Sequence, residues 1–139
     1  MSIYQKIQKD RIEALKAKDI VRKDILGFLV SKLKNRAIEL KVDELADSEV
    51  LSIIQKMCKE LEDEKAGYLK VGMTERATNT SSQLDIVKDY LPKQLTEDEI
   101  KSVIETLTDK TMPSVMKYFK TNYAGQVDMS LVSKIARNV

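Results

Sequence analysis

Apolar residues recur every three or four positions along most of the chain, which is the period of an α-helix. The clearest run is Val50, Ile54, Met57, Leu61 and Tyr68. No segment alternates between apolar and polar residues in the way that a half-buried strand does. Four Gly and two Pro among 139 residues also supply few of the turns that a β-protein needs. The pattern therefore predicts an all-α protein.

Cap and turn residues divide this pattern into separate helices. A first helix is expected over residues 3–18 and a second after Asp19, whose side chain can cap it. The second helix carries apolar residues on two sides, so we expect it to contact more than one neighbour. Asp47 is expected to cap a third helix and Thr74 a fourth. Residues 1–91 are therefore predicted to form an N-terminal antiparallel helical bundle.

Pro92 marks a boundary, because proline disfavours helical geometry in the residue before it and cannot donate a helical hydrogen bond. Thr96 then begins a capping box, with a Glu at the third helical position. Another helix is expected with Pro113 in its first turn, and a last one after Asp128. The last helix carries the apolar residues Leu131, Val132, Ile135 and Val139. A small three-helix C-terminal domain is therefore predicted over residues 92–139.

Composition removes several classes of chemistry. The sequence has no His, which excludes Ser-His-Asp and Cys-His nucleophilic sites and His-ligated metals. Its one cysteine, Cys58, cannot form a disulfide framework or a Cys-cluster zinc site. The segment 67–74 is a near match to a phosphate-binding loop, but Met73 stands where that loop needs Lys, and a helix is expected before it. We therefore expect no catalytic residue, no metal and no cofactor.

The chain is expected to lie in the cytoplasm without contact to a membrane. Its longest apolar run, Ile25 to Val30, has six residues, far fewer than the roughly 20 that span a bilayer as a helix. Its first residues lack the layout of a signal peptide.

Charge is uneven near the C-terminus, although the whole chain has a net charge of only +2. Residues 110–139 hold five basic residues against Asp128 alone, whereas residues 97–109 hold one Lys against five acids. Two basic pairs, each spaced by three residues and off the apolar stripe, can form an edge that faces solvent. These pairs, which we call the basic edge, are Lys117 with Lys120 and Lys134 with Arg137.

A loop with amide and aromatic side chains lies between the two pairs and includes Asn122, Tyr123 and Gln126. Basic residues around an aromatic ring suit RNA, because phosphates bind Lys and Arg and unstacked bases stack on aromatic rings. We expect the basic edge, Asn122 and Gln126 to face phosphates and Tyr123 to stack on a base. The alternative, which charge alone favours, is an ordinary solvated surface with Tyr123 in the core.

The stretch Tyr90-Leu91-Pro92-Lys93-Gln94-Leu95-Thr96-Glu97-Asp98-Glu99-Ile100 resembles the GatB/YqeY family, whose most recognisable segment reads EYLPKQLSEEEI. The resemblance covers nearly the whole chain, and it implies a helical bundle followed by a small three-helix domain. That domain is similar to the tail of the B subunit of aspartyl/glutamyl-tRNA amidotransferase, which helps to hold tRNA. Further points of similarity are Ser2-Ile3-Tyr4, Ser31 to Asn35, Tyr68, Gly72, Arg76, Gly125, Asp128 and Leu131.

The sequence departs from the family pattern in the C-terminal domain. Gln126 stands where the family often has a basic residue, which weakens a tRNA contact carried over from the family. Pro113 and Lys117 stand where the family often has Gly, and Lys117 can partly compensate for the missing charge.

Three functions follow from these observations. The first is a non-catalytic protein that binds tRNA, or associates with a tRNA-dependent amidotransferase, through its C-terminal domain. The second is a protein-interaction module that docks a partner through the N-terminal bundle. An exposed apolar stripe on residues 1–90 would favour the module, whereas a basic edge without such a stripe would favour RNA. The third, a glutamine-dependent carbon–nitrogen ligase, is implied by the family label alone.

Overall fold

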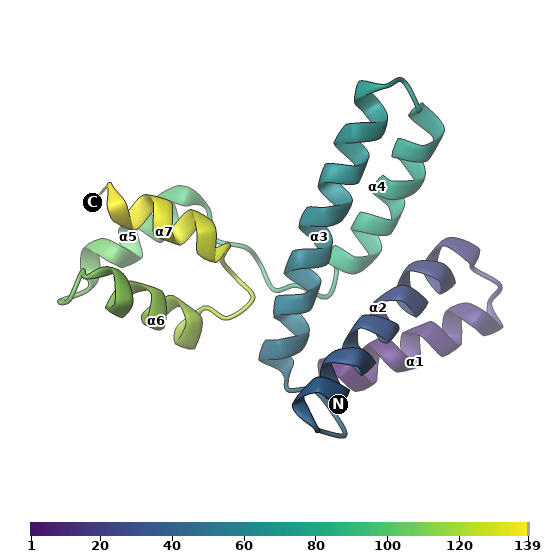
Figure 1. Ribbon diagram of the computed structural model, residues 1–139, viewed down its shortest axis with the longest axis horizontal. Helices are drawn as coiled ribbons and strands as arrows, with labels where there is room; N and C mark the ends of the chain where they lie inside the picture. The colour runs from purple at the N-terminus through teal and green to yellow at the C-terminus, as the bar shows by residue number, and fades with distance from the viewer. Residues whose placement is uncertain (139) are drawn as a thin grey trace. The chain divides into compact units, whose positions relative to one another are not determined.

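The computed structural model describes residues 1–138, and every regular element in that range is an α-helix (Figure 1). The prediction of an all-α protein is therefore confirmed for these residues. Val139, expected in the apolar stripe of the last helix, lies outside the described residues. The helices are α1 (Ile3–Lys16), α2 (Ile20–Leu40), α3 (Asp47–Lys70), α4 (Thr74–Lys88), α5 (Glu97–Thr106), α6 (Met112–Asn122) and α7 (Met129–Arg137).

Contacts between residues divide the chain into two compact units, Met1–Tyr90 and Leu91–Val139. The first, the N-terminal unit, contains α1 to α4, and the second, the C-terminal unit, contains α5 to α7. That residues 1–91 and 92–139 form two separate domains stays a prediction.

The N-terminal unit is built from two helical hairpins (Figure 1). α1 packs against α2, α3 packs against α4, and α2 also contacts α3 and α4. Several neighbours can contact α2 because apolar side chains lie on two of its sides, as the sequence predicts. The buried residues of α2 are Ile25, Leu26, Leu29, Val30, Leu33 and Ala37.

Three helices begin with the predicted side-chain caps. The Asp19 carboxylate accepts a hydrogen bond from the backbone N–H of Arg22, and the Asp128 carboxylate accepts one in the first turn of α7. Thr96 and Glu99 form the predicted capping box. The Thr96 hydroxyl accepts from the Glu99 N–H at 3.2 Å, and the Glu99 carboxylate accepts from the Thr96 N–H at 3.1 Å. These bonds satisfy N–H groups that a helix start leaves without a partner.

Two other predicted caps are wrong. The residue before Asp47 holds the capping position of α3. The Asp47 carboxylate instead accepts a hydrogen bond from the backbone N–H of Ile3 at 3.0 Å, so it joins the start of α1 to the start of α3. Met73 rather than Thr74 is the cap residue of α4, without a side-chain capping bond. Gly72, with φ of 77°, turns the chain just before Met73, so the helix starts one residue earlier than predicted.

The C-terminal unit has a core of its own between α5, α6 and α7. Pro113 lies in the first turn of α6, as predicted. The segment before α5 is held to the loop between α6 and α7 by two hydrogen bonds. The Leu95 N–H donates to the Gln126 carbonyl at 2.8 Å, and the Gln94 amide donates to the Gly125 carbonyl at 2.5 Å. The buried core residues are Ile100, Ile104, Val115, Phe119, Val127 and Val132.

Candidate nucleic-acid interface

The basic pair on α6 faces solvent. Lys117 and Lys120 are exposed, whereas Val115 and Phe119 of the same helix are buried in the core. Neither lysine forms an ion pair with a described residue. This half of the basic edge therefore offers two free ammonium groups.

The pair on α7 is also exposed and lies in the last turn of the helix. The Arg137 guanidinium donates a hydrogen bond to the Ser133 hydroxyl at 3.1 Å. Neither Lys134 nor Arg137 forms an ion pair with a described residue. Cations in the last turn also interact favourably with the negative end of the helix dipole, so these two residues stabilise α7 whether or not they bind an external anion.

The loop residues are more closely tied to the core than the basic pairs. The Asn122 amide donates to the Tyr118 carbonyl at 3.0 Å. Tyr123 is half-buried, and its ring centroid lies 5.5 Å from that of Phe119 and 6.2 Å from that of Tyr118. Gln126 is half-buried as well, and its N–H donates to the Tyr123 carbonyl at 2.9 Å. The Tyr123 ring is thus part of an aromatic cluster, and only its exposed part is open to a base.

The structure brings together one pair of cations that sequence reasoning misses. Lys134 and Lys101 line the same hollow between α5 and α7. Sequence reasoning misses Lys101 because its segment is acidic, with five acids against this one Lys over residues 97–109. In the structure Lys101 forms no ion pair with a described residue. Lys101 joins the site only because α5 packs on α7. No spacing in the sequence encodes this packing, so no sequence signal could have found Lys101.

Two acids of the C-terminal unit accept hydrogen bonds from backbone N–H and hydroxyl groups near helix starts. The N–H and the hydroxyl of Thr96 hold the pKa of Glu99 below its usual value. The N–H of Thr111 and the hydroxyl of Ser114 do the same for the pKa of Asp109. Hydrogen bonds to a carboxylate favour its charged form. These carboxylates are therefore engaged near helix starts.

The one thiol of the sequence does not offer a ready nucleophile. Cys58 is buried on α3. Burial and the charge of Glu62 raise the pKa of its thiol to about 11, and Lys88 opposes this only in part. The thiolate is the reactive form of cysteine, so Cys58 is almost fully protonated at neutral pH and acts as a small apolar core residue.

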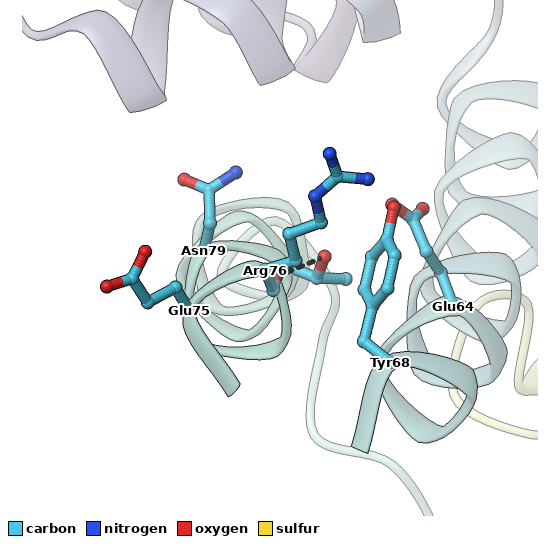
Figure 2. Close-up of a pocket in the computed structure, with 6 residues that line it drawn as sticks. Glu64, Tyr68, Glu75, Arg76 and Asn79 are labelled. Atoms are coloured by element: carbon cyan, nitrogen blue, oxygen red, sulfur yellow. Dashed lines mark hydrogen bonds between the residues drawn. The ribbon is translucent and has the colours of Figure 1, made fainter. Parts of the chain in front are cut away.

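A polar groove lies between α3 and α4 near the turn that joins them. Figure 2 shows the Glu64 carboxylate and the Tyr68 ring on the α3 side, and the Arg76 guanidinium on the α4 side. Acids and a cation share this groove, so it lacks the single sign of charge that binds a chain of phosphates. Its volume is about 340 Å³, and its lining residues are Glu64, Tyr68, Glu75, Arg76, Asn79 and Thr80.

Two further kinds of site can be assessed over residues 1–138. No group of three or more Cys, Asp or Glu side chains in that range is placed to hold a metal ion. No helix in the same range combines the length and the apolar character that crossing a membrane requires.

Over residues 1–138 the fold and the candidate interface define an all-helical protein of two units, whose C-terminal unit exposes cations that form no ion pair with a described carboxylate. Residues 4–139 match the family model described as Yqey-like protein. The chain therefore belongs to the YqeY-like family, and the recognition made from the segment Tyr90 to Ile100 is confirmed.

Several curated relatives share the name altered inheritance of mitochondria protein 41, mitochondrial. The relative from Lachancea thermotolerans is 27% identical over 85 residues, which cover 61% of this chain and 46% of the relative. The relative from Vanderwaltozyma polyspora is 27% identical over 94 residues, which cover 65% of this chain and 51% of the relative. The relative from Komagataella phaffii is 25% identical over 100 residues, which cover 68% of this chain and 53% of the relative. The chain thus spans about half the length of the curated relatives it matches.

Proposed function

We propose that this protein binds tRNA through the basic edge of its C-terminal unit and catalyses no reaction by itself. In this proposal the N-terminal unit is an antiparallel helical bundle, and the C-terminal unit is a three-helix domain like the tail of the amidotransferase B subunit. The observation that carries the proposal is a set of four exposed cations that form no ion pair with a described residue. They are Lys117, Lys120, Lys134 and Arg137.

Phosphates of tRNA supply the partners that these cations lack. Each phosphate that meets a cation releases condensed counterions, and this release favours binding. Arg137 can donate two parallel hydrogen bonds to one phosphate, whereas each Lys acts as a point charge. At the adjacent loop, the exposed part of the Tyr123 ring can stack on an unpaired base.

Membership in the YqeY-like family supports this proposal, because the C-terminal domain of the family resembles the amidotransferase tail that helps to hold tRNA. Association with a tRNA-dependent amidotransferase and a location in the cytoplasm belong to the same proposal. The names of the curated relatives assign those proteins to mitochondria, and that location is a property of the relatives.

The test is the binding of fluorescently labelled bulk tRNA to the full chain in low salt. We compare the wild type, a basic-edge variant with all four cations replaced by Ala, and a control variant. Both variants lose four charges, so a difference between them reports where the charges lie. We expect weak binding by the basic-edge variant and near wild-type binding by the control. Equal binding by all three proteins overturns the proposal. The control replaces four exposed lysines of the N-terminal unit by Ala: Lys34, Lys56, Lys70 and Lys88.

A second candidate function, docking of a protein partner, is favoured by the exposed apolar residues. Within the described chain, every exposed large hydrophobic side chain lies in the N-terminal unit. Exposed apolar residues mark interaction sites where they form a patch. The exposed large hydrophobic residues are Met1, Ile12, Leu15, Ile20, Phe28, Ile38, Leu40, Val42, Leu69, Val71 and Met73.

The turn between α1 and α2 is the best place for such docking. Leu15 is 46% exposed and Ile20 is 67% exposed. Lys16 and Lys18 lie between them and form no ion pair with a described residue. An apolar turn with free cations suits an acidic and apolar surface on a partner such as an amidotransferase subunit.

The docking candidate is tested by replacing Leu15 and Ile20 together by Ser. We expect this variant to lose copurification with a coexpressed amidotransferase while tRNA binding stays at the wild-type level. Unchanged copurification of the double variant removes the candidate.

The ligase alternative gains no support from Cys58, because a buried and protonated thiol is a poor nucleophile. We expect the purified chain to hydrolyse neither ATP nor glutamine. Turnover that is lost on substitution of a single residue would restore this alternative.

A further inference from the structure

α5 and α7 pack side by side in the C-terminal unit (Figure 1) and leave a hollow of about 190 Å³ between them. Only one of its lining residues belongs to the basic edge, so the hollow is a separate feature of this surface. The lining residues are Glu97, Lys101, Leu131, Lys134, Ile135 and Asn138.

Two cations from different helices line this hollow. Lys101 comes from α5 and Lys134 from α7, and neither forms an ion pair with a described residue. Ammonium groups at one site repel each other, and an anion between them converts this repulsion into attraction. Among the described lining residues Glu97 is the one acid, so the two lysines are in excess. The hollow is therefore suited to an anion.

The size and the lining of the hollow restrict which anion it can hold. Pockets for free small-molecule ligands usually measure about 300 to 1,000 Å³, so a hollow of about 190 Å³ suits one unit of a longer chain. Leu131 and Ile135 are half-buried and give it an apolar floor. Glu97 and Asn138 add carboxylate and amide oxygens that can accept hydrogen bonds. An anion with an attached carbon ring and a hydroxyl group matches this combination.

We propose that the hollow between α5 and α7 holds one phosphate–ribose unit of an RNA strand, with Lys101 and Lys134 on the phosphate. This inference rests on the proposed function and extends the tRNA surface from α6 and α7 onto α5. The ribose carbons pack on the apolar floor. Glu97 or Asn138 accepts a hydrogen bond from the 2′-hydroxyl, the group that distinguishes RNA from DNA.

The experiment measures binding of labelled bulk tRNA to the full chain over a salt series, for the wild type, Lys101→Gln and Lys110→Gln. Lys110 is the matched control, because it is an exposed lysine of the same unit outside the hollow. We expect Lys101→Gln to weaken binding several-fold. We also expect the slope of the logarithm of the binding constant against the logarithm of salt to become shallower by about 0.7 to 1, which corresponds to the loss of one phosphate contact. We expect Lys110→Gln to change neither quantity.

A second arm compares single-stranded RNA and DNA of the same sequence. We expect the wild type to prefer RNA, and Glu97→Ala combined with Asn138→Ala to reduce that preference. Equal binding of RNA and DNA by the wild type overturns the ribose contact.

The outcomes separate this inference from the proposed function. If the wild type binds tRNA and Lys101→Gln behaves like Lys110→Gln, the hollow is overturned and the basic edge stands. If the wild type binds no tRNA in low salt, both are overturned. Circular dichroism of each variant checks that its helical content equals that of the wild type.

Discussion

The hydroxyl of Tyr90 donates a hydrogen bond to the Asp10 carboxylate at 2.6 Å, across 80 residues of sequence. Burial opposes the ionisation of Asp10, but this bond and the ammonium group of Lys6 outweigh it and hold the pKa of Asp10 below its usual value. Burial and the same bond raise the pKa of Tyr90. Asp10 therefore stays charged and Tyr90 neutral at physiological pH, and the bond ties the end of the N-terminal unit to α1.

Removal of this hydroxyl tests that bond. We expect Tyr90→Phe to lower the free energy of unfolding at pH 7 by about 1.5 kcal/mol, a typical value for a bond to a charged group. Because the folded-state pKa of Asp10 is lowered, its stabilisation is present above the unfolded-state pKa and is lost as pH falls through the folded-state value. The difference between wild type and variant should therefore shrink below about pH 4. Urea denaturation at several pH values measures it.

The control is Tyr68→Phe, because the Tyr68 hydroxyl makes no hydrogen bond to a described residue. Equal destabilisation by the two substitutions would show that the bond to Asp10 contributes nothing.

The raised pKa of Cys58 predicts that its thiol reacts slowly with thiol reagents. At pH 8 the native protein should react with a thiol reagent far more slowly than the same protein in 6 M guanidinium, because burial both protects the sulfur and keeps it protonated. Absorbance of the released chromophore measures the rate. Fast and complete reaction in native conditions would contradict the burial of Cys58.

At the scale of helices, the two threonines at helix starts differ in role and form a matched pair. We expect Thr96→Ala to destabilise the C-terminal unit by about 1 kcal/mol, because it removes the hydroxyl of the capping box. We expect Thr74→Ala to change stability by less than about 0.5 kcal/mol, because Thr74 makes no side-chain capping bond. Urea denaturation followed by circular dichroism measures both. A larger effect at Thr74 than at Thr96 would contradict these assignments.

Local sequence predicts some of the helix starts and misses others. The caps at Asp19, Thr96 and Asp128 were predictable, because each satisfies an N–H of the helix that it begins. The role of Asp47 was not predictable, because its carboxylate accepts a hydrogen bond from the N–H of Ile3, which is distant in the sequence. Periodicity carries no information about such a long-range bond, although it does predict which helix faces are apolar.

At the scale of the whole molecule, the candidate site was predictable only in part. The exposure of Lys117 and Lys134 follows from their positions off the apolar stripes. The pairing of Lys134 with Lys101 does not, since it depends on which helices pack together. The partial burial of Tyr123 depends on its contact with Phe119, so the sequence left its role as core or stacking residue open.

The division into two units predicts unequal stability. Small domains bury a smaller fraction of their surface than larger ones do, so the fragment 91–139 should unfold at a lower temperature than the fragment 1–90. Thermal melts of the two separately expressed fragments measure this order. A fragment 91–139 that melts above fragment 1–90 would contradict it.

The salt dependence of tRNA binding tests the central claim, that the basic edge holds tRNA by its phosphates. With about three to four phosphate contacts, the logarithm of the binding constant should fall with the logarithm of salt at a slope of roughly −2 to −4. Replacing Lys117, Lys120, Lys134 and Arg137 by Ala should make this slope much shallower without changing the helical circular dichroism. Equal slopes for the wild type and this variant would contradict the claim.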